Sequence, residues 1–246
     1  MTKIHIILII GYLTGLLGFL PGIIFCCALR KMGKRVHGPI MGFSGGLLIA
    51  FVCFEMLPKA FEISGLYLCV AGIFAGIFVC AYLEKRVPFI TEKNFSKSDD
   101  NSLKTGIMLA LGFFIHNIPE GMAIGSMLNI STYSGLRMAV IISIHCFPEA
   151  VALALPFLMS GFELHKMLGL SFIFALPILI GTIIGAFLGS ISPVFISLCL
   201  GLAGGVMIYI TCGEILPNSK DIWKGRLTPV LATTGFVTGV IITSKI

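Results

Sequence analysis

Two short segments of the sequence combine histidine, proline and glutamate in the same order. His116 precedes Glu120 by four residues, and His145 precedes Glu149 by the same interval. A separation of four residues places two side chains on one face of a helix, with Cβ atoms about 5–6 Å apart. Imidazole nitrogens and carboxylate oxygens are ligands that Zn²⁺ accepts, and two carboxylates match its charge. The spacing therefore predicts a site for a divalent cation, with no catalytic residue and no prosthetic cofactor. The alternative is a pair of buried His/Glu hydrogen bonds between packed helices.

Two neighbours of these histidines could take part. Asn117 either ligates a metal through its side-chain oxygen or hydrogen-bonds a backbone carbonyl that proline leaves free. Cys146 either supplies a soft thiolate, which favours Zn²⁺, Cd²⁺ or Cu⁺, or is an inert membrane cysteine. We expect both residues to lie near the predicted site.

The elements that must hold these residues are membrane helices. The chain has 246 residues, of which 57% are hydrophobic and only 11% charged, with a mean hydropathy of +1.04. A soluble domain carries about 25% charged residues, so this composition excludes one. Each spanning helix needs about 20 apolar residues. The apolar stretches predict eight spans, at residues 4–29, 38–58, 63–83, 104–128, 136–160, 166–189, 193–217 and 227–244.

The basic residues give the predicted orientation. The net charge of +6 does not indicate nucleic-acid binding, because the Lys and Arg residues lie in short segments between apolar runs. All but four of the 17 fall in the odd-numbered connections, and the exceptions are Lys3, Lys59, Arg137 and Lys245. We therefore expect both termini outside the cell membrane. The whole chain, residues 1–246, is predicted to be one transmembrane domain, with residues 84–104 forming a cytoplasmic loop between spans three and four.

A repeated segment suggests internal symmetry. Residues 45–58 and 204–217 align with half of their positions identical, including Glu55 and Glu214. The two copies lie in spans two and seven, which run in opposite directions in the predicted topology. This arrangement is typical of transporters with an inverted repeat. The sequence thus predicts an all-α polytopic fold in which spans 1–3 and 6–8 form an inverted repeat around spans 4 and 5. Glu55 and Glu214 are expected at the ends of their spans, Glu55 toward the outside and Glu214 toward the cytoplasm, as an entrance and an exit for cations.

The two His-x-x-Pro-Glu segments, His116 to Glu120 and His145 to Glu149, resemble the paired signature of the ZIP (Zrt/Irt-like) metal transporters, especially short prokaryotic members of the zinc-uptake type. The resemblance covers essentially the whole chain. It implies transport of Zn²⁺, or of Fe²⁺, Mn²⁺, Co²⁺ or Cd²⁺, into the cytoplasm by a membrane protein that is often a homodimer. It also implies that a four-helix transport element slides past a scaffold.

The resemblance further implies that His116, Glu120, His145 and Glu149 form the principal metal site, with Asn117 at its edge. Many members of the family hold a second metal with a carboxylate or asparagine after the span-five histidine and a glutamate before a span-six proline. This sequence has Cys146 and Leu176 at those positions. One metal is therefore expected rather than two.

Two other functions remain compatible with the same residues. The first is an intramembrane metal-dependent hydrolase that activates water at the His/Glu group, although the sequence lacks the His-Glu-x-x-His arrangement of zinc proteases. The second is a proton-coupled transporter of another substrate, in which the buried carboxylates carry protons.

Overall fold

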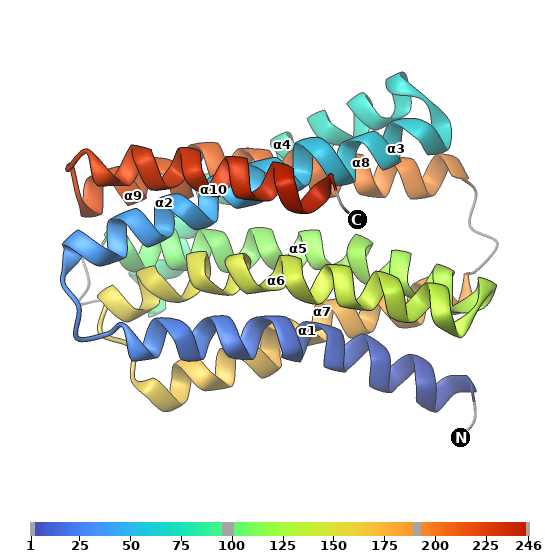
Figure 1. Ribbon diagram of the computed structural model, residues 1–246, viewed down its shortest axis with the longest axis horizontal. Helices are drawn as coiled ribbons and strands as arrows, with labels where there is room; N and C mark the ends of the chain where they lie inside the picture. The colour runs from blue at the N-terminus through green and yellow to red at the C-terminus, as the bar shows by residue number, and fades with distance from the viewer. Residues whose placement is uncertain (1–2, 95–100, 189–192, 245–246) are drawn as a thin grey trace.

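In the computed structural model, which describes residues 3–94, 101–188 and 193–244, every element is helical (Figure 1). Two of these elements are single π-helical turns, labelled η1 and η2. The elements in chain order are α1 (Lys3–Ala28), α2 (Lys34–Phe51), η1 (Val52–Met56), α3 (Leu57–Ser64), α4 (Leu66–Asn94), α5 (Asn101–Ile130), α6 (Thr132–Met159), α7 (Leu164–Phe187), α8 (Pro193–Ile210), η2 (Thr211–Ile215), α9 (Leu216–Ile222) and α10 (Leu227–Thr243).

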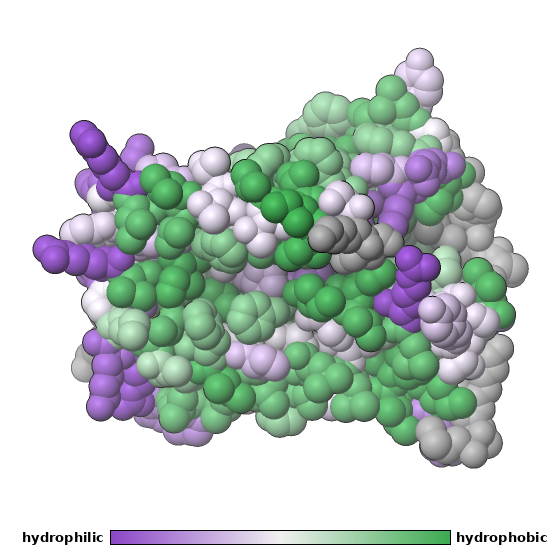
Figure 2. Space-filling view, viewed as in Figure 1, coloured by the Kyte–Doolittle hydropathy of each residue, from purple (hydrophilic) through white to green (hydrophobic). Residues whose placement is uncertain are grey.

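The described helices match the spans expected from hydropathy. Seven are long and apolar enough to cross a membrane, and α10 is an eighth apolar helix of 17 residues. Large apolar side chains such as Leu17 and Phe78 are more than 60% exposed, as lipid-facing side chains would be. Figure 2 shows this apolar surface over the middle of the molecule, with hydrophilic residues toward its ends. The prediction of an all-α polytopic membrane protein is confirmed.

Several helices are longer than predicted. The predicted loop at residues 84–104 is helical in its described parts, because α4 continues to Asn94 and α5 begins at Asn101. Residues 95–100 of that loop lie outside the described residues. Lys and Glu are good helix formers, so a polar sequence does not by itself end a helix.

Glu55 and Glu214 do not end their helices, which corrects the expectation from hydropathy. Each lies in a π-helical turn, after which the helix continues as α3 or α9. Pro58 and Pro217 closely follow these turns in the chain, and neither can donate to the carbonyl four residues earlier. The preceding Leu57 donates instead to the carbonyl of Val52, five residues back, and the equivalent bond is present in η2. The wider turn lets the helix pass the proline without breaking.

The helices form two groups. In the first, α1 packs against α6 and α7, and α5 also packs against α6 and α7. In the second, α2 packs against α10 and α9, and α8 packs against α4 and α3. The groups meet chiefly where α5 contacts α8 and where α6 contacts α2. We call them the α5–α6 bundle and the α2–α8 bundle. Figure 1 shows them as lower and upper layers.

Glycines bring the backbones of the α5–α6 bundle close together. A Cβ added at Gly121 of α5 would overlap the backbone of α7 at Ile178, and one added at Gly181 of α7 would overlap the backbone of α5 at Ile118. Small residues permit such approach between helices in lipid. Gly121 follows Glu120 directly, so this contact fixes the height of the candidate site in the bundle.

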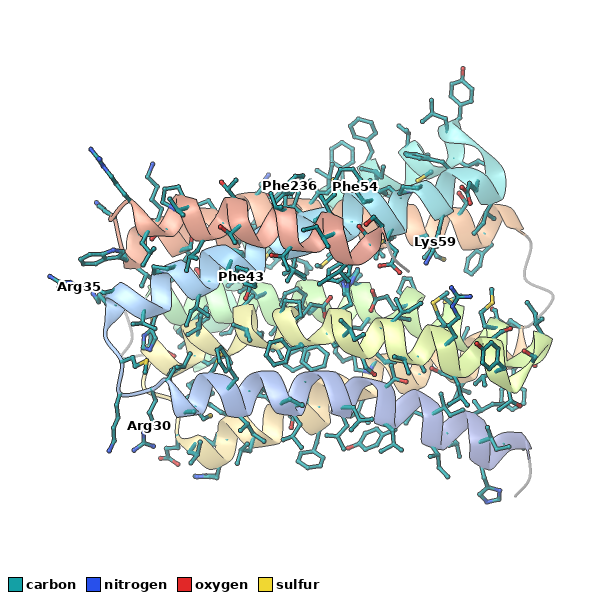
Figure 3. All side chains as sticks on the ribbon, viewed as in Figure 1. Arg30, Arg35, Phe43, Phe54, Lys59 and Phe236 are labelled. Atoms are coloured by element: carbon teal, nitrogen blue, oxygen red, sulfur yellow. The ribbon has the colours of Figure 1, made fainter. Side chains whose placement is uncertain are left out.

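Three basic residues mark the two ends of the molecule. Arg30 and Arg35 lie at the end where α1 passes into α2, while Lys59 lies toward the opposite end (Figure 3). The start of α1 and the end of α10 (Figure 1) point toward the same end of the molecule as Lys59 (Figure 3).

Candidate metal centre

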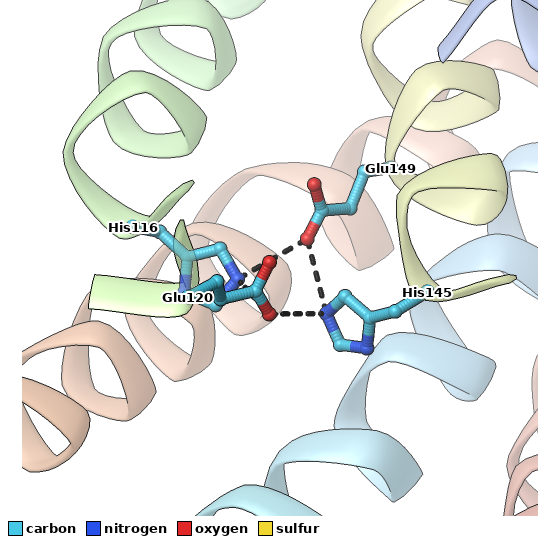
Figure 4. A group of neighbouring side chains, drawn as sticks. All are labelled: His116, Glu120, His145 and Glu149. Carbon is cyan, nitrogen blue, oxygen red and sulfur yellow. Dashed lines mark ion pairs between the residues drawn. The ribbon is translucent and has the colours of Figure 1, made fainter. Parts of the chain in front are cut away.

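Two adjacent helices supply the four residues that the sequence analysis selected. His116 and Glu120 lie on α5, and His145 and Glu149 lie on α6. The i,i+4 spacing directs both side chains of each helix toward the other helix, as Figure 4 shows. One ligand atom from each residue can be chosen so that all four lie within 4.8 Å of one another. The structure therefore brings the predicted set together.

The nitrogen and oxygen atoms of this group alternate in space. The Nε2 atom of His116 lies 3.2 Å from Glu120 Oε1 and 3.2 Å from Glu149 Oε1. The Nε2 atom of His145 lies 3.0 Å from Glu149 Oε1 and 3.6 Å from Glu120 Oε1. Four ligands at about 2.05 Å from a zinc ion stand about 3.3 Å apart in a tetrahedron. Four of the six ligand–ligand distances are thus close to the edge of a tetrahedral zinc site, and the other two, nitrogen to nitrogen and oxygen to oxygen, are at most 4.8 Å.

The group is buried in the protein. His116 and Glu149 are fully buried, and Glu120 and His145 are at most 5% exposed. Within the described part of the chain, no hydrogen-bond partner is found for either Nε2 atom, for Glu120 Oε2 or for either oxygen of Glu149. The nitrogens and oxygens of the group face one another at ion-pair distances of 3.0 to 3.6 Å. Buried polar atoms are normally hydrogen-bonded, so a set without hydrogen-bond partners needs an explanation, such as a bound ion.

The α2–α8 bundle touches both histidines. The Nδ1 atom of His116 lies 3.3 Å from the backbone oxygen of Ala203 in α8. A proton on Nδ1, donated to this carbonyl, leaves the lone pair of Nε2 directed into the group, which is the usual orientation of a metal-binding histidine. The ring of Phe51 in α2 lies edge-on to His145, with centroids 4.8 Å apart. The site is therefore carried by one bundle and contacted by the other.

The two predicted neighbours differ in their surroundings. Asn117 is fully buried, and neither its amide nitrogen nor its oxygen has a hydrogen-bond partner among the described residues. Cys146 is also buried, but its Cβ faces Gly18 of α1. It lies outside the group of four, because it is one position from His145 and so points in a different direction around α6.

A cavity of about 470 Å³ reaches the group from the side of Glu55. Glu120 and His145 line its inner part, and Glu55, Lys59 and Glu62 line its outer part. Cys199 and four methionines also line this cavity. The methionines are Met56, Met122, Met127 and Met138.

A second cavity, of about 650 Å³, lies on the side of Glu214. Its acidic lining residues are Glu84, Glu214 and Asp221. Glu214 accepts a hydrogen bond of 3.2 Å from Thr105, and the hydroxyl of Tyr209 donates to Glu84. None of the four grouped residues is among its described lining residues, so this cavity does not open onto the group.

Sequence reasoning missed three contributors. Phe51 and the Ala203 carbonyl come from helices remote in sequence, and no local pattern marks them. Lys59 did carry a signal, because it follows Glu55 by four residues, the spacing of an ion pair on one helix face. Its position at the mouth of the cavity becomes visible only in the folded chain.

Comparison with known proteins decides the family. Residues 90–246, more than half of the chain, match the family described as ZIP zinc transporter. The chain belongs to the ZIP zinc transporter family. It is similar to the zinc transporter ZupT of Clostridium perfringens, with 27% identity over 94% of this chain and 92% of the relative. It is also similar to ZupT of Chlorobaculum parvum, with 29% identity over 96% and 92% of the two chains. A plant relative, zinc transporter ZTP29 of Arabidopsis thaliana, is 28% identical over 81% of this chain and 80% of the relative.

Membership of the ZIP family confirms the resemblance noted in the sequence. The chain is a multi-pass membrane protein and a transporter of a divalent metal, and it is not an enzyme such as the hydrolase considered above. The metal is the transported substrate rather than a prosthetic group.

Proposed function

We propose that this protein carries Zn²⁺ across the cell membrane and that His116, Glu120, His145 and Glu149 bind the ion during transport. The observation that carries the proposal is the alternating set of nitrogen–oxygen distances of 3.0 to 3.6 Å, which suits a four-coordinate ion with two nitrogen and two oxygen ligands. Two carboxylates neutralise a divalent charge in a buried site. The same ligand types also bind Fe²⁺, Mn²⁺, Co²⁺ and Cd²⁺, so these ions are further predicted substrates.

We expect one ion per chain, with Asn117 at the edge of the site. The unpaired amide of Asn117 supports a role beside His116. Cys146 is not part of the proposed pathway because its Cβ faces α1. Leu176 is 42% exposed, which supports the expectation that no second metal is held there.

The cavities support a pathway from Glu55 through the group to Glu214. Only the first of the two cavities described above is lined by members of the group, namely Glu120 and His145. A transporter must expose its site to the two sides in turn. The α5–α6 bundle carries all four ligands, and the α2–α8 bundle contacts them through Phe51 and Ala203. Movement of one bundle against the other would open the Glu214 side, in agreement with the sliding that the resemblance implies.

Packing supports the inverted repeat. In such a repeat, span one corresponds to span six, span two to span seven, span three to span eight, and span four to span five. The contact of α1 with α6 then corresponds to the contact of α7 with α5. In the same way, the contact of α2 with α10 corresponds to that of α8 with α4.

The repeated segments agree in detail. Gly45 lies against Ile215 and Leu216, and its counterpart Gly204 lies against Met56 and Leu57. These four neighbours are themselves counterparts in the aligned segments. The π-helical turns also coincide in the alignment. All of this supports one transmembrane domain built from two inverted halves around α5 and α6.

The excess of basic residues at the end marked by Arg30 and Arg35 supports a cytoplasmic position for that end. The Glu55 cavity would then open outside, and both termini would be outside. Transport into the cytoplasm is what the family resemblance implies. An epitope tag at each terminus should be removed by protease added to intact cells. Protection of either tag would contradict this orientation. Contact with lipid and a homodimer remain predictions.

Uptake into proteoliposomes tests the function. Vesicles containing the wild-type chain should accumulate ⁶⁵Zn²⁺, and His116→Ala should abolish the uptake. His165→Ala is the matched control, because His165 is 75% exposed and pairs with Glu163 away from the group. A wild-type protein that binds Zn²⁺ but moves none would contradict the proposal. Failure to respond to any divalent metal would favour the proton-coupled alternative.

A further inference from the structure

The outer part of the Glu55 cavity contains an ion pair that the proposed pathway does not explain. The Nζ atom of Lys59 lies 3.0 Å from Glu55 Oε1. The Glu55 side chain is only 13% exposed, whereas that of Lys59 is 45% exposed. Both residues line the cavity that reaches Glu120 and His145. A cation that enters this cavity therefore meets a carboxylate that already holds an ammonium group.

The wider mouth contains two more charged residues. An adjoining cavity of about 480 Å³ is lined by Glu55, Lys59, Glu62 and Arg137. Glu62 also lines the cavity that reaches the metal group, but Arg137 is not among the described residues lining it. Among these described lining residues, Lys59 is the one cationic side chain shared by both cavities. Its side chain therefore borders both the mouth and the cavity that reaches the group.

The other copy of the repeat lacks this cation. Lys59 aligns with Asn218, which follows Glu214 by the same four residues. Asn218 donates to the hydroxyl of Thr105, and that hydroxyl donates to Glu214. Glu55 is thus paired with the cationic side chain of Lys59, whereas the corresponding Glu214 accepts a hydrogen bond from the neutral hydroxyl of Thr105. This difference distinguishes the two ends of an otherwise similar repeat.

The charge of the entering ion decides whether it can replace the ammonium. At equal distance, a carboxylate attracts a divalent ion twice as strongly as a monovalent one. A sodium ion would exchange one unit charge for another and would compete with an ammonium that is tethered at high effective concentration. A divalent ion is attracted to the carboxylate more strongly than the ammonium that it displaces.

We propose that Lys59 is a specificity-determining residue. Its ammonium stays paired with the Glu55 carboxylate until a divalent cation displaces it, and this ion pair excludes monovalent cations from the entrance. The inference rests on the proposed transport function. It does not require Lys59 to contact the metal site.

The decisive variant is Lys59→Asn, which gives the outer copy the residue of the inner one. Initial rates of ⁶⁵Zn²⁺ uptake into proteoliposomes would be measured with either Na⁺ or choline as the external cation. The KM for Zn²⁺ in choline should fall about two- to fivefold, the range expected on removing a competing exposed ion pair. Na⁺ should inhibit the variant and leave the wild type unaffected. Lys59→Arg, which keeps the cation, should behave as the wild type.

Lys166→Asn is the matched control, because Lys166 pairs with Glu163 at 3.4 Å on an exposed surface. Neither residue is among the described residues lining these cavities. A second background, Glu55→Gln, separates competition for the carboxylate from general repulsion. If Lys59 competes with the metal for Glu55, the effect of Lys59→Asn should disappear in this background. An equal fall in KM in both backgrounds would overturn the proposal.

Other outcomes separate this inference from the proposed function. If uptake depends on His116 and Lys59→Asn changes neither KM nor sodium sensitivity, the role of Lys59 is overturned while the transport proposal stands. If the wild type shows no uptake, both fail. Size-exclusion profiles of the variants establish folding, and Lys59→Gln provides a second neutral variant for the same comparison.

Discussion

Replacement of Glu149 by glutamine tests the proposed metal site, because it removes a negative charge with little change in the shape of the side chain. Glu149 Oε1 lies within 3.2 Å of both histidine Nε2 atoms, so it forms two edges of the proposed tetrahedron. Structural zinc sites with four ligands bind with about 10–16 kcal/mol, or about 3 kcal/mol per ligand. Loss of the carboxylate charge should therefore weaken Zn²⁺ binding roughly 100-fold.

Thermal unfolding in detergent measures this loss. At a Zn²⁺ concentration about 100 times the wild-type Kd, bound metal should stabilise the wild type by about 2.7 kcal/mol. The same concentration should stabilise Glu149→Gln by only about 0.4 kcal/mol, since the concentration would then equal the Kd. Glu163→Gln is the control, because the Glu163 side chain is 60% exposed and lies outside the group. A Glu149→Gln protein that Zn²⁺ stabilises as much as it does the wild type would refute the assignment of this ligand.

Three further substitutions test the packing and the pathway. Gly205→Ala should destabilise the fold by about 1–3 kcal/mol in thermal unfolding, because its Cβ would overlap the α4 backbone, whereas Gly169→Ala should not, since nothing lies within 4 Å of that position. Glu214→Gln should lower the maximal rate of ⁶⁵Zn²⁺ uptake several-fold while the stabilisation by Zn²⁺ is kept, and an unchanged rate would remove Glu214 from the exit pathway. Cys146→Ala should keep uptake within about twofold of the wild type, because the residue packs against Gly18; a large loss would return Cys146 to the pathway.

The candidate site was predictable because its information is local. Four-residue spacing fixes the relative direction of His116 and Glu120 on one helix, and the same holds for His145 and Glu149. The short connection between α5 and α6 makes these helices antiparallel neighbours. The sequence could not predict the nitrogen–oxygen distances, because these depend on how closely the two helices pack.

The π-helical turns at Glu55 and Glu214 were not predictable in the same way. A proline indicates a weak point in a helix, but whether the helix ends, kinks or widens depends on what packs beyond it. Here Ser197 of α8 donates to the carbonyl of Ala60, which ties α3 to its neighbour. Hydropathy therefore identified the spans and placed these two glutamates wrongly at the ends of helices.

X-ray absorption at the zinc edge, on purified protein loaded with Zn²⁺, tests the central claim most directly. The proposed site predicts one zinc ion per chain with four nitrogen or oxygen ligands at about 2.0–2.2 Å, and with the scattering pattern of two imidazole rings. The signal should be lost in His116→Ala and kept in His165→Ala. A sulfur ligand at about 2.3 Å, or an unchanged zinc environment in His116→Ala, would contradict the account.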